Sequence, residues 1–218
     1  MRSLAIVLFF TLASLSCQSG DGQKEAEIPS SEKHLFYLHG RIIELQGLPA
    51  ESPEFGPYEY AAIIDSFRQN GFVVHHEVRT ATSDFFSFVE ALSLAVDSLL
   101  NEQVAPSNIT VVGASKGAVM SMYLSHLNPA PIRYVLLGAN NDQIEEQFDW
   151  QLHGTILGVY EASDLLAGKN YDYWANRSPN AERFEQLRLN TSLDHGFFYR
   201  PIQEWLKPTI AWAKHGQL

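Results

Sequence analysis

The chain has 218 residues, of which 45% are hydrophobic and 12% aromatic, which is enough for one packed core and excludes a disordered chain. Its formal charge is −10 at pH 7, with 25 acidic residues against 15 basic ones. Such a charge excludes nucleic acid and anionic lipid headgroups as expected partners.

The first residues carry a targeting pattern. Arg2 is followed by an apolar run at 4–15 and by the single cysteine, Cys17. This run is shorter than the roughly 20 residues that span a bilayer. A positive start, a short apolar stretch and small residues before a cysteine resemble the signal peptide of bacterial lipoproteins. The resemblance implies that Cys17 becomes the lipidated first residue, and an ordinary secretory signal peptide is the alternative.

The expected organisation therefore has three parts. Residues 1–16 form the lipoprotein signal peptide, 17–32 form the lipidated cysteine and a polar, flexible tether, and 33–218 form the folded domain. A single cysteine excludes an intramolecular disulfide, so the domain folds on its hydrophobic core alone. The expected location is outside the cytoplasm, held by lipid to a bacterial membrane in the periplasm or at the cell surface.

Short β-branched or aromatic runs alternate with stretches of helical period from His34 onward. Most of the runs are almost continuously apolar, as strands covered on both faces are. The pattern predicts an α/β domain with six parallel strands and helices on both faces of the sheet. The predicted strands are 34–40, 71–79, 108–115, 132–139, 153–163 and 182–190.

Helices are predicted between these strands from apolar residues at helical spacing. The first stripe ends before Gly71, and the second begins after Ser83 and Asp84, which suit a helix N-terminus. Further helices are predicted after Lys116, near 142–148 and over 201–214. Pro208 is expected to kink or split the last helix. The two core stripes are Tyr60, Ile63, Ile64 and Phe67, and then Phe85, Phe88, Val89, Leu92, Val96 and Leu99.

The strongest chemical motif is G-x-S-x-G at 113–117, between a predicted strand and a predicted helix. A sharp turn there holds Ser115 in strained geometry and exposes its hydroxyl, while the glycines remove side chains that would collide. A serine hydroxyl needs a base within hydrogen-bond reach and a carboxylate to orient that base. The motif predicts that Ser115 is a nucleophile.

From His34 to the C-terminus, the chain resembles a compact member of the α/β-hydrolase superfamily, whose catalytic residues follow in the order nucleophile, acid, histidine. The resemblance implies that Asp164, after the strand at 153–163, is the acid. It also implies that His195, in the loop before the last helix, is the general base. A helix-capping aspartate is the alternative role for Asp164.

Other residues compete for these two roles. Asp142 is the main rival acid, since some members of the superfamily place the acid after the preceding strand, and Glu161 and Asp172 are further rivals. Seven histidines remain beside His195, and each is expected to be an ordinary core or surface residue. They are His34, His39, His75, His76, His126, His153 and His215.

The resemblance also implies an oxyanion hole, which the superfamily builds from two backbone amides. These correspond to the N–H groups of Lys116, after the nucleophile, and of Arg41, after the first strand. The Arg41 side chain has two possible roles, a contact to an anionic group of the substrate or simple solvation. Both remain open from the sequence.

The loops predict an uncapped site. About fifteen residues separate the strand at 132–139 from the next one, which leaves no room for a lid domain. The site is expected to be roofed by the loop 41–58 and by the segment 170–180. Aromatic side chains of that segment are candidates for substrate binding, although packing within a long loop also explains them. They are Tyr171, Tyr173 and Trp174.

Together these features predict a serine hydrolase, similar to carboxylesterases, that cleaves an ester-like acyl bond. Thioesterase, lysophospholipase, acetyl-carbohydrate esterase and peptidase activities share the mechanism and stay open. No metal-binding spacing or nucleotide-binding loop is present, so no cofactor and no metal are expected. Dehalogenase and epoxide hydrolase chemistry is disfavoured because those relatives use an aspartate where Ser115 stands. A non-catalytic binding lipoprotein with a hydrolase fold is the second hypothesis.

Overall fold

The computed structural model describes residues 31–218. The predicted signal peptide at 1–16, Cys17 and nearly all of the tether lie outside the described residues. Within 31–218, no helix combines the length and the apolar character needed to cross a membrane.

The domain is built on one six-stranded sheet in which all neighbouring strands are parallel. The order of strands across the sheet is β4-β1-β5-β6-β7-β8. This confirms the predicted fold class and the count of six parallel strands. The strands are β1 (Lys33–Leu38), β4 (Phe72–His76), β5 (Ile109–Ala114), β6 (Arg133–Leu137), β7 (Gly154–Glu161) and β8 (Ala181–Leu189).

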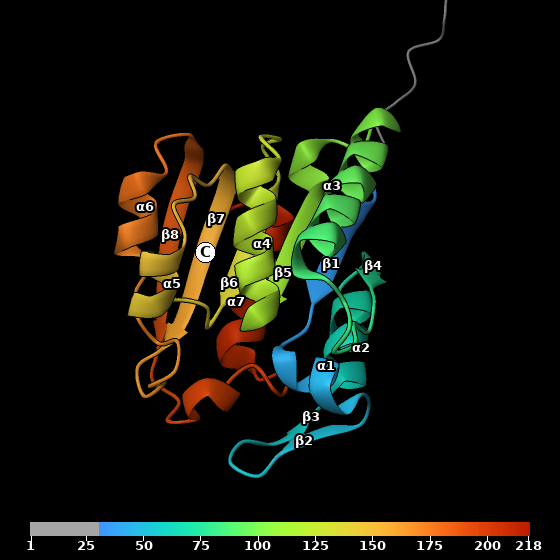
Figure 1. Cartoon of the computed structure of the whole chain (residues 1–218). Coiled ribbons are helices and arrows are strands. Elements are labelled where there is room, and N and C mark those ends of the chain that lie inside the picture. Colours follow the sequence, from blue (N-terminus) through green and yellow to red (C-terminus); the bar gives the residue numbers. More distant parts are fainter. Residues whose placement is uncertain (1–30) are drawn as a thin grey trace, which may run out of the picture.

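Seven α-helices of the described chain surround the sheet, and Figure 1 shows α3 and α4 in front of it and α7 behind it. Each predicted helix is present, with ends shifted by a few residues. The helices are α1 (Arg41–Gln46), α2 (Tyr60–Gln69), α3 (Phe85–Asn101), α4 (Lys116–Leu127), α5 (Asp142–Gln147), α6 (Asp172–Arg177) and α7 (Gln203–His215).

Two hydrophobic cores lie on opposite faces of the sheet. One joins the strands to α2 and α7, through buried residues such as Phe67 and Trp205. The other joins the strands to α3 and α4, through residues such as Val89 and Met120. Because both faces are covered, β5 is buried at every position, which explains its continuous apolar sequence.

Three local features differ from the sequence prediction. The loop at 41–58 contains α1 and an antiparallel hairpin, β2 (Ala50–Ser52) and β3 (Gly56–Tyr58). The segment at 170–180 contains α6 rather than a roof over the site. Helix α7 is not split at Pro208, because its buried face, including Thr209 and Trp212, packs against the rest of the domain and offsets the lost hydrogen bond.

The parallel arrangement brings the carboxyl ends of all six strands to one edge of the sheet, which is marked by the arrowheads in Figure 1. Ser115, Asp164 and His195 each follow one of these strands. This edge is where ligands bind in open α/β sheets.

Candidate active site

Ser115 lies on the sharp turn between β5 and α4. Its backbone has φ 51° and ψ −119°, in the left-handed half of backbone space, which is strained for a side chain other than glycine. The glycines of the motif are required by close packing. A Cβ on Gly113 would lie 2.4 Å from the carbonyl oxygen of Gly117, and a Cβ on Gly117 would lie 2.0 Å from the carbonyl oxygen of Leu38. The turn therefore tolerates no larger residue at either position.

A chain of two hydrogen bonds joins the three predicted catalytic residues. The Nε2 atom of His195 lies 2.9 Å from Oγ of Ser115, and its Nδ1 atom lies 2.7 Å from Oδ2 of Asp164. His195 sits in a short 3₁₀ turn, Asp194–Gly196, and packs edge-on against Phe198. The structure brings together the three residues that the sequence singled out, in the geometry of a nucleophile, base and orienting acid.

Asp164 makes the contacts expected for both roles that the sequence left open. Its Oδ1 atom accepts hydrogen bonds from the backbone N–H groups of Leu166 (2.8 Å) and Ala167 (2.9 Å), as a capping residue does, while Oδ2 faces His195. Burial opposes ionisation, but the hydrogen bonds from His195 and from these amides outweigh it and hold the pKa of Asp164 below its usual value. The carboxylate is thus ionised and fixed in orientation.

The rival acids are bound elsewhere. Asp142 is exposed and pairs with Lys169 at 2.6 Å. Glu161 is buried and accepts hydrogen bonds from Thr191, and Asp172 accepts one from Gln186. Among the histidines of the described chain, only His195 hydrogen-bonds to Ser115.

The loop after β1 lies against the nucleophile. A Cβ on Gly40 would be 3.6 Å from Cβ of Ser115, and Gly40 and Arg41 line the same cavity as Ser115. Lys116 and Arg41 are the first residues of α4 and α1, whose first N–H groups have no partner within the helix. The expected oxyanion donors therefore lie on two segments that meet beside Ser115.

Two small cavities adjoin the candidate triad. The first has a volume of about 210 Å³ and contains Ser115 in its wall. The second, of about 240 Å³, lies beside Asp164 and Asp194. Phe55, Leu166 and His195 line both cavities and separate them. Phe55 comes from the hairpin β2–β3, so this hairpin, rather than a lid domain, roofs the site.

The aromatic residues proposed for substrate binding lie elsewhere. Tyr171 and Trp174 have no exposed surface and pack in the core beside α3 and α4. The Tyr171 hydroxyl bonds to the backbone of Leu136 and Ala139, and Trp174 bonds to Asn140. Tyr173 packs edge-on against Trp174. The expected substrate contacts of Tyr171 and Trp174 are corrected, because helix formation at 172–177 turns these rings inward.

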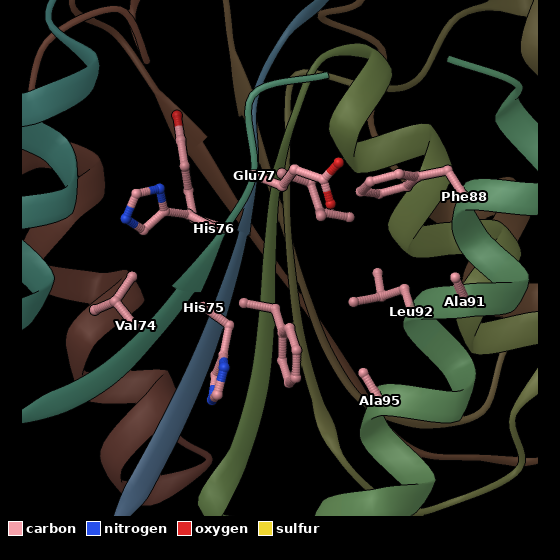
Figure 2. A pocket seen from close by; sticks show the side chains of 11 residues that line it. Val74, His75, His76, Glu77, Phe88, Ala91, Leu92 and Ala95 are labelled. Atoms are coloured by element: carbon pink, nitrogen blue, oxygen red, sulfur yellow. The ribbon is translucent and has the colours of Figure 1, made fainter. Parts of the chain in front are cut away.

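A separate cavity of about 440 Å³ lies between the edge strand β4 and α3. Figure 2 shows its lining, with His75 and His76 on the strand side and Phe88, Ala91 and Leu92 on the helix side. None of the three predicted catalytic residues lines it. It is thus a further cavity of the fold, distinct from the two beside the candidate triad.

The sequence reasoning missed three residues near the site. Phe55 roofs it, and Glu44 and Arg79 form buried ion pairs beside Lys116. Arg41 and Arg79 each lie three residues after the end of a strand, β1 and β4 respectively. This shared position was the sequence feature that could have pointed to Arg79. In the described part of the chain, no group of three His, Cys, Asp or Glu side chains is placed to hold a metal ion.

Comparison with known proteins gives structural matches alone. No family model matches the chain, and no curated protein sequence matches it. An esterase of Pyrococcus furiosus, Pf2001, is similar at TM-score 0.59 and 14% identity, over 84% of this chain and 83% of that one. SOBER1 of Arabidopsis thaliana is similar at TM-score 0.53 and 14% identity, over 85% and 99%.

A protein of Pectobacterium atrosepticum described as a YdeN-like hydrolase is similar at TM-score 0.55 and 15% identity, over 86% of this chain and 94% of that one. All these identities are low, so the likeness concerns the fold. The six-stranded parallel sheet and its surrounding helices match those of the hydrolase neighbours. The chain has the α/β-hydrolase fold.

Proposed function

We propose that the protein is a serine hydrolase that transfers an acyl group from an ester to water. The observation that carries the proposal is the hydrogen-bonded chain from Ser115 through His195 to Asp164. The three-dimensional likeness to esterases supports the same reaction class. Residues so arranged convert a weak nucleophile into a reactive one.

In the proposed reaction, Oγ of Ser115 forms a bond to the carbonyl carbon while its proton passes to Nε2 of His195. The carbonyl π electrons move to the oxygen, where the N–H groups of Lys116 and Arg41 stabilise the negative charge. The carbonyl reforms, the bond to the leaving alkoxide breaks, and His195 gives the proton to that oxygen. Water then repeats the sequence on the acyl-serine, which releases the acid and restores the Ser115 hydroxyl.

The size of the cavity at Ser115 favours a short acyl group. The cavity has a volume of about 210 Å³ and is partly open to solvent, so it suits a small acyl group without setting a sharp limit on its length. Phe55 and Phe198 line the cavity. A short-chain carboxylester is therefore the favoured substrate, ahead of a thioester, a lysophospholipid or a peptide.

The test is labelling with a fluorophosphonate, which forms a covalent bond to an activated serine. We expect the full-length protein to be labelled at Ser115, identified by mass spectrometry of the labelled peptide, and Ser115→Ala to remain unlabelled. Absence of label on the wild-type protein, under conditions that label a control esterase, would leave the non-catalytic binding lipoprotein as the better hypothesis.

We further propose that the protein is exported and anchored through a lipid on Cys17. The support is the arrangement of Arg2, the apolar run at 4–15 and the cysteine in the sequence. Cys17→Ser expressed in a bacterial host should move the protein from the membrane fraction to the soluble fraction. Retention of this variant in the membrane fraction contradicts a lipid anchor.

A further inference from the structure

A buried network of charges lies behind the proposed oxyanion hole. Arg79 follows β4, and its side chain has no exposed surface. Its Nε atom donates to Oε1 of Glu44 at 2.9 Å, and its Nη2 atom donates to the carbonyl oxygen of His39. The ammonium group of Lys116 donates to the other carboxylate oxygen of Glu44 at 2.5 Å. One buried carboxylate thus joins two cations from different segments.

The ends of this network are the segments that carry the two candidate oxyanion donors. The carbonyl of His39 belongs to the peptide that leads into Gly40 and then Arg41. At the other end, the Lys116 side chain belongs to the residue whose own N–H is the first donor. Arg79 and Glu44 therefore connect the loop after β1 to the first residue of α4.

The ring of His39 ties the same loop to Arg79 a second time. Its Nε2 atom accepts a hydrogen bond from the backbone N–H of Arg79 at 2.9 Å, so the proton sits on Nδ1, which donates to the carbonyl of Gly40 at 2.9 Å. Burial, followed by the charge of Arg79, lowers the pKa of His39 to about 4. The ring is neutral at pH 7, as an acceptor at Nε2 requires.

The Arg79–Glu44 ion pair of this network is shielded from water, while the Lys116 side chain reaches the surface. The Glu44 side chain is 3% exposed, and the Arg79 guanidinium lies 5.2 Å from the centre of the Phe88 ring. Figure 2 shows Phe88 projecting from α3 toward the strands. Arg79 and Glu44 lie in a region of low dielectric, where hydrogen bonds between charged groups hold their partners firmly, and Lys116 joins this pair from the protein surface.

We propose that Arg79 and Glu44 are positioning residues that fix the spacing of the Lys116 and Arg41 amides for the anionic tetrahedral intermediate. The guanidinium fork holds the loop through the His39 carbonyl, and Glu44 transmits that position to Lys116. Donors in an oxyanion hole must match the oxyanion rather than the substrate carbonyl. Loss of the network therefore weakens transition-state binding more than substrate binding. This inference rests on the proposed esterase function.

Lys116→Met is the first test, because it cuts the network and keeps the backbone N–H of Lys116. The Lys116 side chain is 30% exposed, so the variant is expected to fold. We expect kcat on a short-chain nitrophenyl ester to fall about tenfold and KM to change by less than about twofold. The inhibition constant of phenylboronic acid, which mimics the tetrahedral anion, should rise about tenfold. Lys116→Arg should restore both to within about threefold of wild type.

Arg79→Lys is the second test, because it keeps the buried charge and loses the fork that reaches two acceptors at once. We expect kcat to fall about 100-fold, since a small misplacement near the chemistry has an effect of that order. The matched control is Arg183→Met, which cuts an ion pair to Glu185 on β8. This control should leave kcat, KM and boronate affinity at wild-type values.

The outcomes separate the inference from the proposed function. If wild type is labelled by fluorophosphonate and hydrolyses the ester, but Lys116→Met and Arg79→Lys behave like Arg183→Met, the network is only structural and the inference is overturned. If wild type is neither labelled nor active, both proposals fall. If Arg79→Lys does not fold, the pair Lys116→Met and Lys116→Arg decides, since thermal unfolding shows whether those proteins are native.

Discussion

The Nε2 atom of His195 lies 2.9 Å from the hydroxyl oxygen of Ser115, although 80 residues separate them in the sequence. The distance is that of a hydrogen bond from the serine hydroxyl to the imidazole. Nδ1 of the same ring is held by Asp164, so the ring cannot turn away without breaking that bond. The ring is therefore held in an orientation that places Nε2 at the Ser115 hydroxyl.

Asp164→Asn should lower kcat by a factor of about 10² to 10⁴, because an amide holds the imidazole in the wrong tautomer and does not stabilise its charged form. Asp142→Asn is the matched control, since Asp142 is exposed and pairs with Lys169. Steady-state kinetics on one ester, with circular dichroism as a folding check, measures both. A larger loss in Asp142→Asn than in Asp164→Asn would show that the acid is misassigned.

Gly117→Ala should destabilise the fold by about 1 to 3 kcal/mol, because its Cβ would lie 2.0 Å from the carbonyl oxygen of Leu38 and backbone would have to move. Gly40→Ala is the control. Its Cβ would meet Cβ of Ser115 at an ordinary 3.6 Å, so stability should change by less than about 0.5 kcal/mol. Urea unfolding of both variants decides, and equal stabilities would contradict the close approach of β1 and α4.

The pKa of His39, lowered to about 4, makes stability depend on pH. In the unfolded chain the pKa of His39 is near 6.5. Between pH 6.5 and pH 4, the unfolded chain therefore binds a proton that the native His39 ring does not, so acidification favours unfolding. The stabilisation, of the order of 3 kcal/mol, is fully present above pH 6.5 and is lost as the pH falls toward 4. His39→Gln should lose less stability than wild type on acidification, as measured by urea unfolding at several pH values. Parallel curves for the two proteins would refute this.

If the protein is the proposed esterase, Phe55→Ala should lengthen the acyl groups that it accepts, because the Phe55 ring lines the cavity at Ser115. We expect the optimum of kcat/KM to move from about two to four carbons in wild type to about six or more in the variant. Leu48→Ala, which alters the same connection but lines a different cavity, serves as the control. An unchanged chain-length profile for Phe55→Ala would place the acyl group elsewhere.

The sequence predicted the sheet and the triad for a physical reason. Strands buried on both faces are almost continuously apolar, so β1, β5 and β6 are visible as short hydrophobic runs. Gly113 and Gly117, on either side of Ser115, indicate a tight turn, because a Cβ at either glycine would collide with backbone atoms. The resemblance to the superfamily then implied Asp164 and His195, and parallel strands bring the ends that these residues follow to one edge.

The sequence did not distinguish a capping role from a catalytic role for Asp164. A carboxylate has two oxygen atoms, and only the fold shows that one accepts from the amides of Leu166 and Ala167 while the other faces His195. The predicted positions of Tyr171 and Trp174 were wrong for a related reason. The sequence around an aromatic residue does not show whether its ring lies beside a site or in the core. Their burial was decided by α6.

The sequence by itself determined the fold class and the candidate nucleophile Ser115, because strand pattern and turn chemistry depend on neighbouring residues. Asp164 and His195 were implied by the resemblance to the α/β-hydrolase superfamily. Only the tertiary structure decided that Glu44 joins Arg79 to Lys116, and that Phe55 reaches the cavity at Ser115. These contacts join segments from different connections of the sheet. Their geometry depends on how the loops at its carboxyl edge pack together, which no local pattern specifies.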